Sequence, residues 1–319
     1  MKTVLVNLTL EERHKQKLEA AAPGCRFVYA PNGVLTPEMA QDAEIVVGFP
    51  PAKWIAGSPK LEWLQLLSAG ADAYLKPGIL APGVKLTNAT GAYGKAVSEH
   101  GLALTLTLMK KLHSYRDYQR QHAWKDAGPV TSLTDATVLV VGLGDIGLTY
   151  ARMAKALGAP RVIGVKRRPG DCPDYVDELC LTEELDRVLP EADVIFSVLP
   201  GTPDTFHFYT AERFAAMKAT AIFVNCGRGS AVETQVLLEA LRQGQIAAAG
   251  VDVTELEPLP AESPLWELDN LLITPHVAGN FHLADILEQV VKITAENLRR
   301  YLAGRPLQNV VDFATGYKK

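Results

Sequence analysis

Residues 138–147 read VLVVGLGDIG, an apolar run that passes directly into a glycine–x–glycine–x–x–glycine turn. In such a turn between strand and helix, the first glycine permits the tight bend, the second lets the backbone approach a pyrophosphate, and the third lets helix and strand pack closely. The N–H groups at the start of the helix then face the anion. A helical pattern from Ile146 to Leu157 and a second strand at 161–165 follow. The stretch therefore predicts a dinucleotide site rather than a structural turn, formed by Gly142, Gly144, Asp145, Ile146 and Gly147.

The second strand of this unit runs into Lys166-Arg167-Arg168. A site for NAD usually carries Asp or Glu about 20 residues beyond the glycines, where the carboxylate binds the ribose hydroxyls. Three cations at that point would instead attract a 2′-phosphate. The alternative is an ordinary basic surface loop. The cluster favours NADP as the preferred cofactor, with NAD as the other candidate.

Composition narrows the class of protein. The chain has 319 residues, 48% apolar and 21% charged, which is enough for two globular domains. Its net charge of −4 gives no reason to expect nucleic acid or an anionic membrane as a partner. The four cysteines show no CxxC pair and no metal-ligand spacing, so reduced thiols and no metal site are expected. Without a membrane-spanning run or signal-peptide features, we expect a soluble, cytoplasmic protein.

Strands alternate with helices along most of the chain, which is typical of parallel α/β sheets. In the first part, strands are expected at 3–6, 27–29, 44–47, 63–67 and 85–88, with helices at 11–21 and 37–41. They predict a small, flavodoxin-like α/β domain. From Thr137 the alternation restarts, with strands at 138–141, 161–165, 194–199, 221–225, 247–252 and 271–274. Six parallel strands would form a doubly wound Rossmann sheet.

Two longer helical patterns, Lys95 to Leu112 and Ala284 to Tyr301, flank these six strands. We therefore predict that the Rossmann domain, residues 98–284, is inserted into the smaller substrate domain, residues 1–97 and 285–319. The cleft between the two domains would then be the active site.

Three polar residues follow late strands, at the edge where open α/β sheets bind their ligands. Arg228 follows the fourth Rossmann strand, Glu257 the fifth and His276 the sixth. Together they suit reduction of a 2-oxo acid. Arg228 would bind the substrate carboxylate and polarise the carbonyl, and His276 would give a proton to the carbonyl oxygen. Glu257 would orient the imidazole and keep it protonated near neutral pH.

Each residue alone has a structural alternative, such as a turn histidine or an Arg–Glu bridge. Three in succession after a nucleotide turn favour the catalytic interpretation. Other reactive residues have weaker claims. Cys226 lies beside Arg228, but no base is spaced to make it a nucleophile. We expect three further histidines at the surface: His14, His113 and His122.

Beyond these patterns, the chain resembles the D-isomer-specific 2-hydroxyacid dehydrogenases over nearly its whole length. The Arg–Glu–His order and the interval between Arg228 and Glu257 are similar to those of the family. The matching segments are SAGAD at 68–72, VSEH at 97–100, the glycine turn at 142–147, NCGRG at 225–229, residues 252–260, SPLW at 263–266, TPH at 274–276 and the ending Gly316-Tyr317.

The resemblance implies further site residues. The backbone N–H groups of Ala69 and Gly70 would bind the substrate carboxylate, and Asp252 would face the nicotinamide amide. Leu199, Pro200 and Thr205 would border the adenosine. The resemblance also implies cofactor contacts from Cys226, Gly227, His276 and Gly279. A homodimer through the Rossmann domains, with residues 98–112 at the interface, is implied as well.

Two departures from the family pattern matter. Lys166 in place of an acid is similar to the NADP-preferring glyoxylate and hydroxypyruvate reductases. Asn280 replaces a small hydroxyl residue and, with Phe281 and His282, leaves the shape of the substrate pocket open. The sequence does not identify the acid, the direction of turnover or the pathway. We predict an NADPH-dependent reductase of a small 2-oxo acid. The alternatives are an NAD-dependent phosphoglycerate- or lactate-type dehydrogenase and, from another class, an NAD(P)-sensing regulatory protein.

Overall fold

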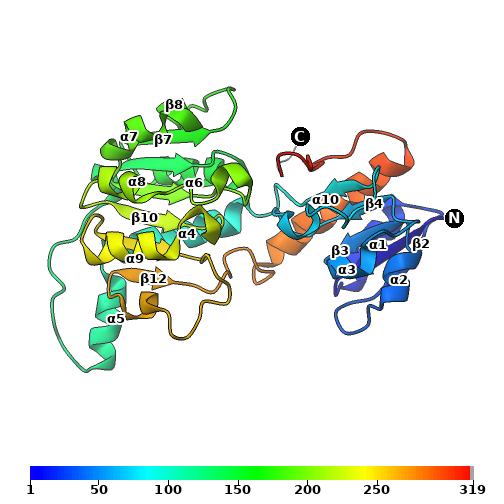
Figure 1. The fold of residues 1–319 in the computed structure, drawn as a ribbon, viewed down its shortest axis with the longest axis horizontal. Coiled ribbons are helices and arrows are strands. Elements are labelled where there is room, and N and C mark those ends of the chain that lie inside the picture. Colours follow the sequence, from blue (N-terminus) through cyan, green and yellow to red (C-terminus); the bar gives the residue numbers. More distant parts are fainter. Residues whose placement is uncertain (317–319) are drawn as a thin grey trace. The chain divides into compact units, whose positions relative to one another are not determined.

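The computed structural model describes residues 1–316 (Figure 1), so Tyr317 of the family-like ending lies outside the described residues. The chain divides into two compact units. Unit 1 comprises Met1–Tyr93 and Phe281–Lys319, and unit 2 comprises Gly94–Asn280. The chain thus leaves unit 1 after Tyr93 and returns at Phe281, whereas the sequence predicted these crossings at 97/98 and 284/285.

Unit 1 is built on a five-stranded parallel sheet with the order β2-β1-β3-β4-β5, which is the flavodoxin-like order. This confirms the predicted fold of the smaller domain. The strands are β1 Thr3–Asn7, β2 Arg26–Tyr29, β3 Ile45–Gly48, β4 Trp63–Gln65 and β5 Lys85–Thr87. The helices are α1 Glu12–Ala21, α2 Pro37–Asp42, α3 Ala52–Ile55 and α10 Ala284–Leu302.

The returning helix α10 packs on α1, and this contact buries His14 completely. Nε2 of His14 lies 2.9 Å from Oε1 of Glu288 on α10. The prediction that His14 lies at the surface was therefore wrong, because its partner is far away in the sequence. After α10, Val310 forms an antiparallel bridge with Thr87 at the edge of the sheet.

Unit 2 contains a seven-stranded parallel sheet with the order β12-β11-β10-β9-β6-β7-β8. This is the doubly wound Rossmann order with one additional strand beyond β11. The strands are β6 Thr137–Val141, β7 Arg161–Lys166, β8 Glu178–Leu181, β9 Val194–Ser197, β10 Ile222–Asn225, β11 Ala248–Val251 and β12 Leu271–Ile273. All six predicted strands are present, and β8 was missed.

Alternate residues of these buried strands face opposite sides of the sheet, as the pleat requires. Leu139 and Ile195 belong to the large apolar cluster that includes residues of α7, α8 and α9. Phe196 instead faces α4, since a Cβ on Gly101 of that helix would lie 2.3 Å from its ring. The helices of this unit are α4 Gly94–Met109, α5 Leu112–Arg120, α6 Asp145–Ala156, α7 Leu185–Val188, α8 Ala211–Ala216 and α9 Thr234–Arg242.

The predicted helix from Lys95 to Leu112 is interrupted at its end. α4 stops at Met109, and α5 begins at Leu112 after Lys111 has adopted a left-handed conformation with φ +54°. A left-handed residue cannot continue a right-handed helix, so the chain changes direction there. None of the helices in residues 1–316 combines the length and the apolar character that crossing a membrane would require. All four cysteines are free.

Candidate active site

The glycine turn lies at the centre of the carboxyl edge of the sheet in unit 2. The N–H of Gly142 donates to the carbonyl of Val165 at 3.0 Å, so the turn is held against the end of β7. Gly142 has φ +102°, and a Cβ there would lie 2.9 Å from the carbonyl oxygen of Val198, just after β9. A Cβ on Gly147 would lie 2.2 Å from the carbonyl oxygen of Gly142. Packing within the chain therefore requires glycine at both positions.

Gly144 has a different explanation. It immediately precedes α6, its φ is −95°, and a Cβ built on it would meet no heavy atom of the described residues within 4 Å. The protein itself therefore does not need glycine here. Open space beside the N-terminus of a 12-residue helix is what a closely approaching pyrophosphate needs. The turn, with Asp145 and Ile146 in the first helical turn, thus fits a dinucleotide.

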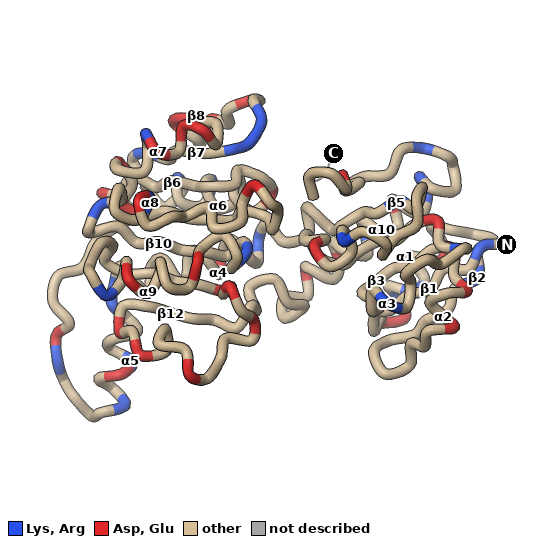
Figure 2. Tube along the Cα trace, viewed as in Figure 1, with Lys and Arg blue, Asp and Glu red and all other residues tan. Residues whose placement is uncertain are grey.

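The basic cluster lies on the strand next to the glycine turn. β7 ends at Lys166, which is half-buried like Arg167, while Arg168 is exposed. Figure 2 shows the blue stretch where the chain leaves β7. A Cβ on Gly170 would lie 2.6 Å from Nζ of Lys166, so the ammonium group lies over the loop backbone. The three cations therefore occupy the end of β7, where a nucleotide ribose is bound in this fold.

The predicted adenosine-bordering residues follow β9 and form a closed turn. Oγ1 of Thr205 donates to the carbonyl of Pro200 at 2.5 Å and accepts the N–H of Thr202 at 3.0 Å. Leu199 and Thr205 are both buried. Since the carbonyl oxygen of Leu199 would lie 2.5 Å from a Cβ on Gly227, this turn also contacts the loop after β10.

The loop after β10 carries Arg228. Asn225 at the strand end holds it from both sides, because its Oδ1 accepts the N–H of Gly227 at 3.1 Å and its Nδ2 donates to the carbonyl of Arg228 at 3.0 Å. A Cβ on Gly229 would lie 2.0 Å from the carbonyl of Thr254, so the loop packs against the segment that leads to Glu257. Arg228 itself is half-buried.

Cys226 lies in the same loop and is buried. Burial raises the pKa of the Cys226 thiol, and the nearby Asp252 carboxylate raises it further. A thiol in this state is protonated and a poor nucleophile. These contacts support the expectation that Cys226 does not react.

Asp252 organises the turn after β12 that carries His276. Its side chain is only 2% exposed, its Oδ1 accepts the N–H of Val277 at 3.0 Å, and its Oδ2 accepts the N–H of Ala278 at 3.0 Å. The N–H of His276 donates to the carbonyl of Asp252 at 2.7 Å. His276 has φ +53°, a conformation that costs an L-residue about 1–2 kcal/mol, so these bonds offset local strain.

The structure brings Glu257 and His276 together. Oε2 of Glu257 lies 2.7 Å from Nδ1 of His276, and both side chains are partly exposed to solvent. Arg228, Glu257 and His276 therefore stand on loops that follow β10, β11 and β12, three neighbouring strands of one sheet. A carboxylate that accepts from one imidazole nitrogen leaves the other nitrogen for acid–base chemistry.

His207 and Glu255 form a second histidine–glutamate pair, which was not predicted from the sequence. Glu255 lies two residues before Glu257. Oε1 of Glu255 lies 2.7 Å from Nε2 of His207, and its Oε2 accepts the N–H and the hydroxyl of Thr234, both at 2.8 Å. Burial opposes ionisation of this carboxyl, but the hydrogen bonds from Thr234 and His207 lower its pKa overall. Glu255 thus fixes the segment that presents Glu257.

In unit 1, the loop after β4 contains Ala69 and Gly70, the predicted donors to the substrate carboxylate. The carbonyl of Ala69 accepts from Nδ2 of Asn88 at 2.6 Å, and the carbonyl of Gly70 accepts from Oγ of Ser68 at 2.6 Å. Within residues 1–316, the N–H groups of Ala69 and Gly70 donate to no protein oxygen. The carbonyls are therefore fixed, and the amides are available to an anion.

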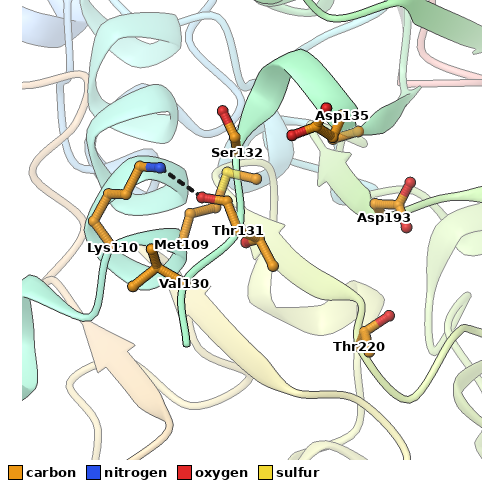
Figure 3. Close-up of a pocket in the computed structure, with 9 residues that line it drawn as sticks. Met109, Lys110, Val130, Thr131, Ser132, Asp135, Asp193 and Thr220 are labelled. Carbon is orange, nitrogen blue, oxygen red and sulfur yellow. Dashed lines mark hydrogen bonds between the residues drawn. The ribbon is translucent and has the colours of Figure 1, made fainter. Parts of the chain in front are cut away.

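A separate hollow of about 450 Å³ lies at the opposite edge of the sheet in unit 2 (Figure 3). Its lining comes from the end of α4 and from residues that precede β6, β9 and β10, and Lys110 donates to the carbonyl of Thr131 there at 2.7 Å. None of the predicted site residues contributes to it. Because parallel α/β sheets bind ligands at the carboxyl ends of their strands, we do not assign the chemistry to this hollow.

Comparison with known proteins identifies a family for this chain. The sequence profile described as "D-isomer specific 2-hydroxyacid dehydrogenase, NAD binding domain" matches residues 102–278. A protein named glyoxylate/hydroxypyruvate reductase B from Citrobacter koseri is 32% identical over 260 residues, which cover 80% of this chain and 79% of that protein.

Two solved structures are similar over almost the whole chain. One is a D-isomer specific 2-hydroxyacid dehydrogenase family protein from Aeromonas salmonicida, with a TM-score of 0.86, 36% identity and coverage of 98% of this chain and 99% of that one. The other is an NADPH-dependent glyoxylate/hydroxypyruvate reductase from Sinorhizobium meliloti in complex with NADP and sulfate. It has a TM-score of 0.83, 28% identity and coverage of 99% and 100%.

Proposed function

The chain belongs to the D-isomer specific 2-hydroxyacid dehydrogenase family and is therefore an oxidoreductase, and from this premise we propose that it reduces a small 2-oxo acid to the D-2-hydroxy acid with NADPH as the preferred cofactor. The observation that carries the proposal is the 2.7 Å contact between Glu257 and His276, on the edge of the sheet that also carries Arg228 and the glycine turn. A general acid, its carboxylate partner and a cation for the substrate are the groups that this reduction needs.

Arg228, Glu257 and His276 would each have a separate role in this reduction. Arg228 binds the substrate carboxylate through its guanidinium fork and draws electron density from the neighbouring carbonyl. A nicotinamide cofactor, when bound, would supply the hydride to the carbonyl carbon. His276 gives the proton from Nε2 to the carbonyl oxygen, since its Nδ1 is engaged by Glu257. Glu257 stabilises the imidazolium before transfer and keeps the ring in one orientation.

Binding of the cofactor would use the glycine turn for the pyrophosphate and Lys166, Arg167 and Arg168 for a 2′-phosphate. Support comes from the open space beside Gly144 and from the placement of the cations on the adjacent strand end. NAD, which lacks the phosphate, would bind more weakly because it forgoes charge-assisted hydrogen bonds. Asp252, Thr205, Cys226, Gly227 and Gly279 would complete the predicted cofactor contacts.

The substrate is proposed to be of the glyoxylate or hydroxypyruvate type, because the relatives from Citrobacter koseri and Sinorhizobium meliloti carry that name. The amides of Ala69 and Gly70 would provide further donors to its carboxylate. Fixed amides suit an anion better than flexible side chains, since they lose little conformational freedom on binding.

We also propose that the protein is a cytoplasmic homodimer formed through unit 2. α5 contains no buried residue among those described; its first residue, Leu112, is 53% exposed, and Trp124 beyond its end is 106% exposed. Exposed apolar side chains of this size commonly mark a protein interface. Four free thiols fit a reducing compartment.

A direct assay tests the reductase proposal. Purified protein would be mixed with NADPH or NADH and with glyoxylate, hydroxypyruvate, pyruvate or a longer 2-oxo acid, and cofactor oxidation followed by absorbance. We expect turnover with a small 2-oxo acid and a higher kcat/KM with NADPH. Preference for NADH would support the phosphoglycerate- or lactate-type alternative. Binding of the cofactor without oxidation by any acid would support the sensor alternative and contradict the enzyme.

A further inference from the structure

The turn that carries His276 depends on a chain of hydrogen bonds that begins outside the predicted site. Besides the backbone amides of this turn, the buried Asp252 carboxylate accepts the hydroxyl of Thr274, whose Oγ1 lies 2.6 Å from Oδ1. Nε2 of His100 on α4 lies 2.9 Å from the same Thr274 oxygen and 3.6 Å from Oδ1 of Asp252. The three side chains thus connect α4 to the turn.

The proton positions in this chain follow from counting donors. A threonine hydroxyl has one proton, and an ionised carboxylate can only accept. The short contact with Asp252 uses that proton, so the Thr274 oxygen must accept from His100. His100 therefore carries a proton on Nε2, and the direction of donation is His100 to Thr274 to Asp252.

α4 holds His100 in a fixed place. Gly101 and Gly250 permit the helix to lie directly on the sheet, because a Cβ on Gly101 would lie 2.3 Å from the Phe196 ring and one on Gly250 would lie 3.2 Å from Cβ of Leu104. Ser98 donates to the carbonyl of Ile146 at 2.8 Å, which ties α4 to α6. A donor on such an element has little freedom to move away from its acceptor.

We propose that His100 is a positioning residue for the reaction: by donating to Thr274 it locks the hydroxyl onto Asp252 and so fixes the turn that aims His276 at the substrate. This rests on the proposed function, because it requires His276 to be the proton donor. His100 does not contact the substrate in this proposal. Its loss would allow Thr274 to rotate and the strained backbone at His276 to relax, which displaces the imidazole.

The test compares His100→Leu, which removes the donor, with His100→Gln, which retains an N–H donor. Lys95→Leu removes an exposed polar side chain from the same helix and serves as the control. We expect His100→Leu to lower kcat about 10- to 100-fold, the cost typical of a small misplacement of a catalytic group. His100→Gln should recover most of this loss. The solvent deuterium isotope effect on kcat should rise in His100→Leu, because proton transfer becomes slower than hydride transfer.

A double-mutant cycle with Thr274→Val determines whether the effect passes through Thr274. If it does, the variant carrying both His100→Leu and Thr274→Val is no slower than the slower single variant, while Thr274→Ser stays close to wild type. If the loss of kcat in the double variant instead equals the product of the losses in the two single variants, the proposal is overturned. An unchanged kcat and isotope effect in His100→Leu would overturn it as well. The dissociation constant for NADPH, measured by fluorescence, should stay within about threefold of wild type, consistent with an intact fold.

Failure of this inference is distinguishable from failure of the proposed function. A fully active His276→Ala variant would contradict the proposed function itself. An inactive His276→Ala variant together with a fully active His100→Leu variant would contradict only the positioning role.

Discussion

Nδ1 of His276 lies 2.7 Å from Oε2 of Glu257, and the other oxygen of Glu257 accepts the N–H of Thr254 at 3.1 Å. The backbone of Thr254 therefore orients the Glu257 carboxylate, which in turn orients the imidazole. Because Nδ1 is engaged, Nε2 is the nitrogen that can donate to a substrate.

Replacing His276 by Ala should lower kcat by roughly 10²–10⁴-fold, the usual contribution of a general acid. Glu257→Gln keeps a hydrogen-bonding side chain but removes the charge that stabilises the imidazolium, so a smaller loss of about tenfold is expected. Steady-state kinetics and NADPH titration would measure both. Glu262→Gln, an exposed carboxylate of the same segment, is the control. Loss of NADPH binding in His276→Ala would mean that the residue is structural.

Cofactor preference should depend on the end of β7. Lys166→Asp combined with Arg167→Ala removes two cations and adds a carboxylate that can bind ribose hydroxyls, so kcat/KM should fall for NADPH and rise for NADH. The ratio of the two kcat/KM values is the measurement. Lys53→Asp makes a similar charge change on α3 and should leave the ratio unaltered. A ratio that survives the double change would show that the 2′-phosphate is bound elsewhere.

The loop after β4 should control substrate binding rather than chemistry. Asn88→Ala removes the donor to the Ala69 carbonyl, so the amides lose their fixed direction. We expect KM for the 2-oxo acid to rise about tenfold, since one lost hydrogen bond to an anion is worth roughly 1.5 kcal/mol, while KM for NADPH stays constant. Asn32→Ala in another loop of unit 1 is the control. An unchanged substrate KM would contradict the anion-binding assignment.

Dimer formation should depend on the exposed apolar residues around α5. Trp124→Glu and Leu112→Glu each place a charge where the proposed interface would desolvate it, which is strongly unfavourable. Light scattering after gel filtration should give a dimer mass for wild type and a monomer mass for the variants at micromolar concentration. Val34→Glu, at a residue that is 51% exposed in unit 1, should remain dimeric. A monomeric wild-type protein would refute the assembly.

Acid should weaken unit 1 through Glu288, which links α10 to α1. Hydrogen bonds from Lys17 and His14 lower the pKa of Glu288 from its ordinary value of 4.5 to about 2. A carboxylate whose pKa is lower in the folded state contributes stability that is complete above about pH 4.5 and disappears as the pH falls through 2. Wild type should therefore lose melting temperature more steeply between pH 5 and pH 3 than Glu288→Gln, by calorimetry. Glu12→Gln, on the exposed side of α1, should follow wild type.

Most of both sheets was predictable because each central strand is a short apolar run bounded by turn residues. β8 was not predicted because Glu178–Leu181 is a short edge strand in which only alternate residues are strongly apolar. The end of α4 was not predicted because no glycine or proline marks it; a lysine, Lys111, adopts the left-handed conformation there. Local patterns of sequence do not contain such tertiary effects.

The site could be predicted where function lies at the ends of strands, and Arg228, Glu257 and His276 were found in this way. Their catalytic roles stay predictions, but the structure places the last two in hydrogen-bonding contact. His207 and His100 could not be found, because their partners Glu255 and Thr274 are 48 and 174 residues away. A contact between residues so far apart in the sequence is recognised only once the folded sheet brings separate segments together.

Because the space beside Gly144 is open, selection for a folded protein and selection for cofactor binding would act differently on this residue. In a library screened only for folded protein, Gly142 and Gly147 would tolerate no side chain, while alanine at Gly144 would pass, because it meets no atom of the described chain. In a library screened for turnover, all three positions would be depleted. The difference between the two screens at this single codon would report cofactor contact directly.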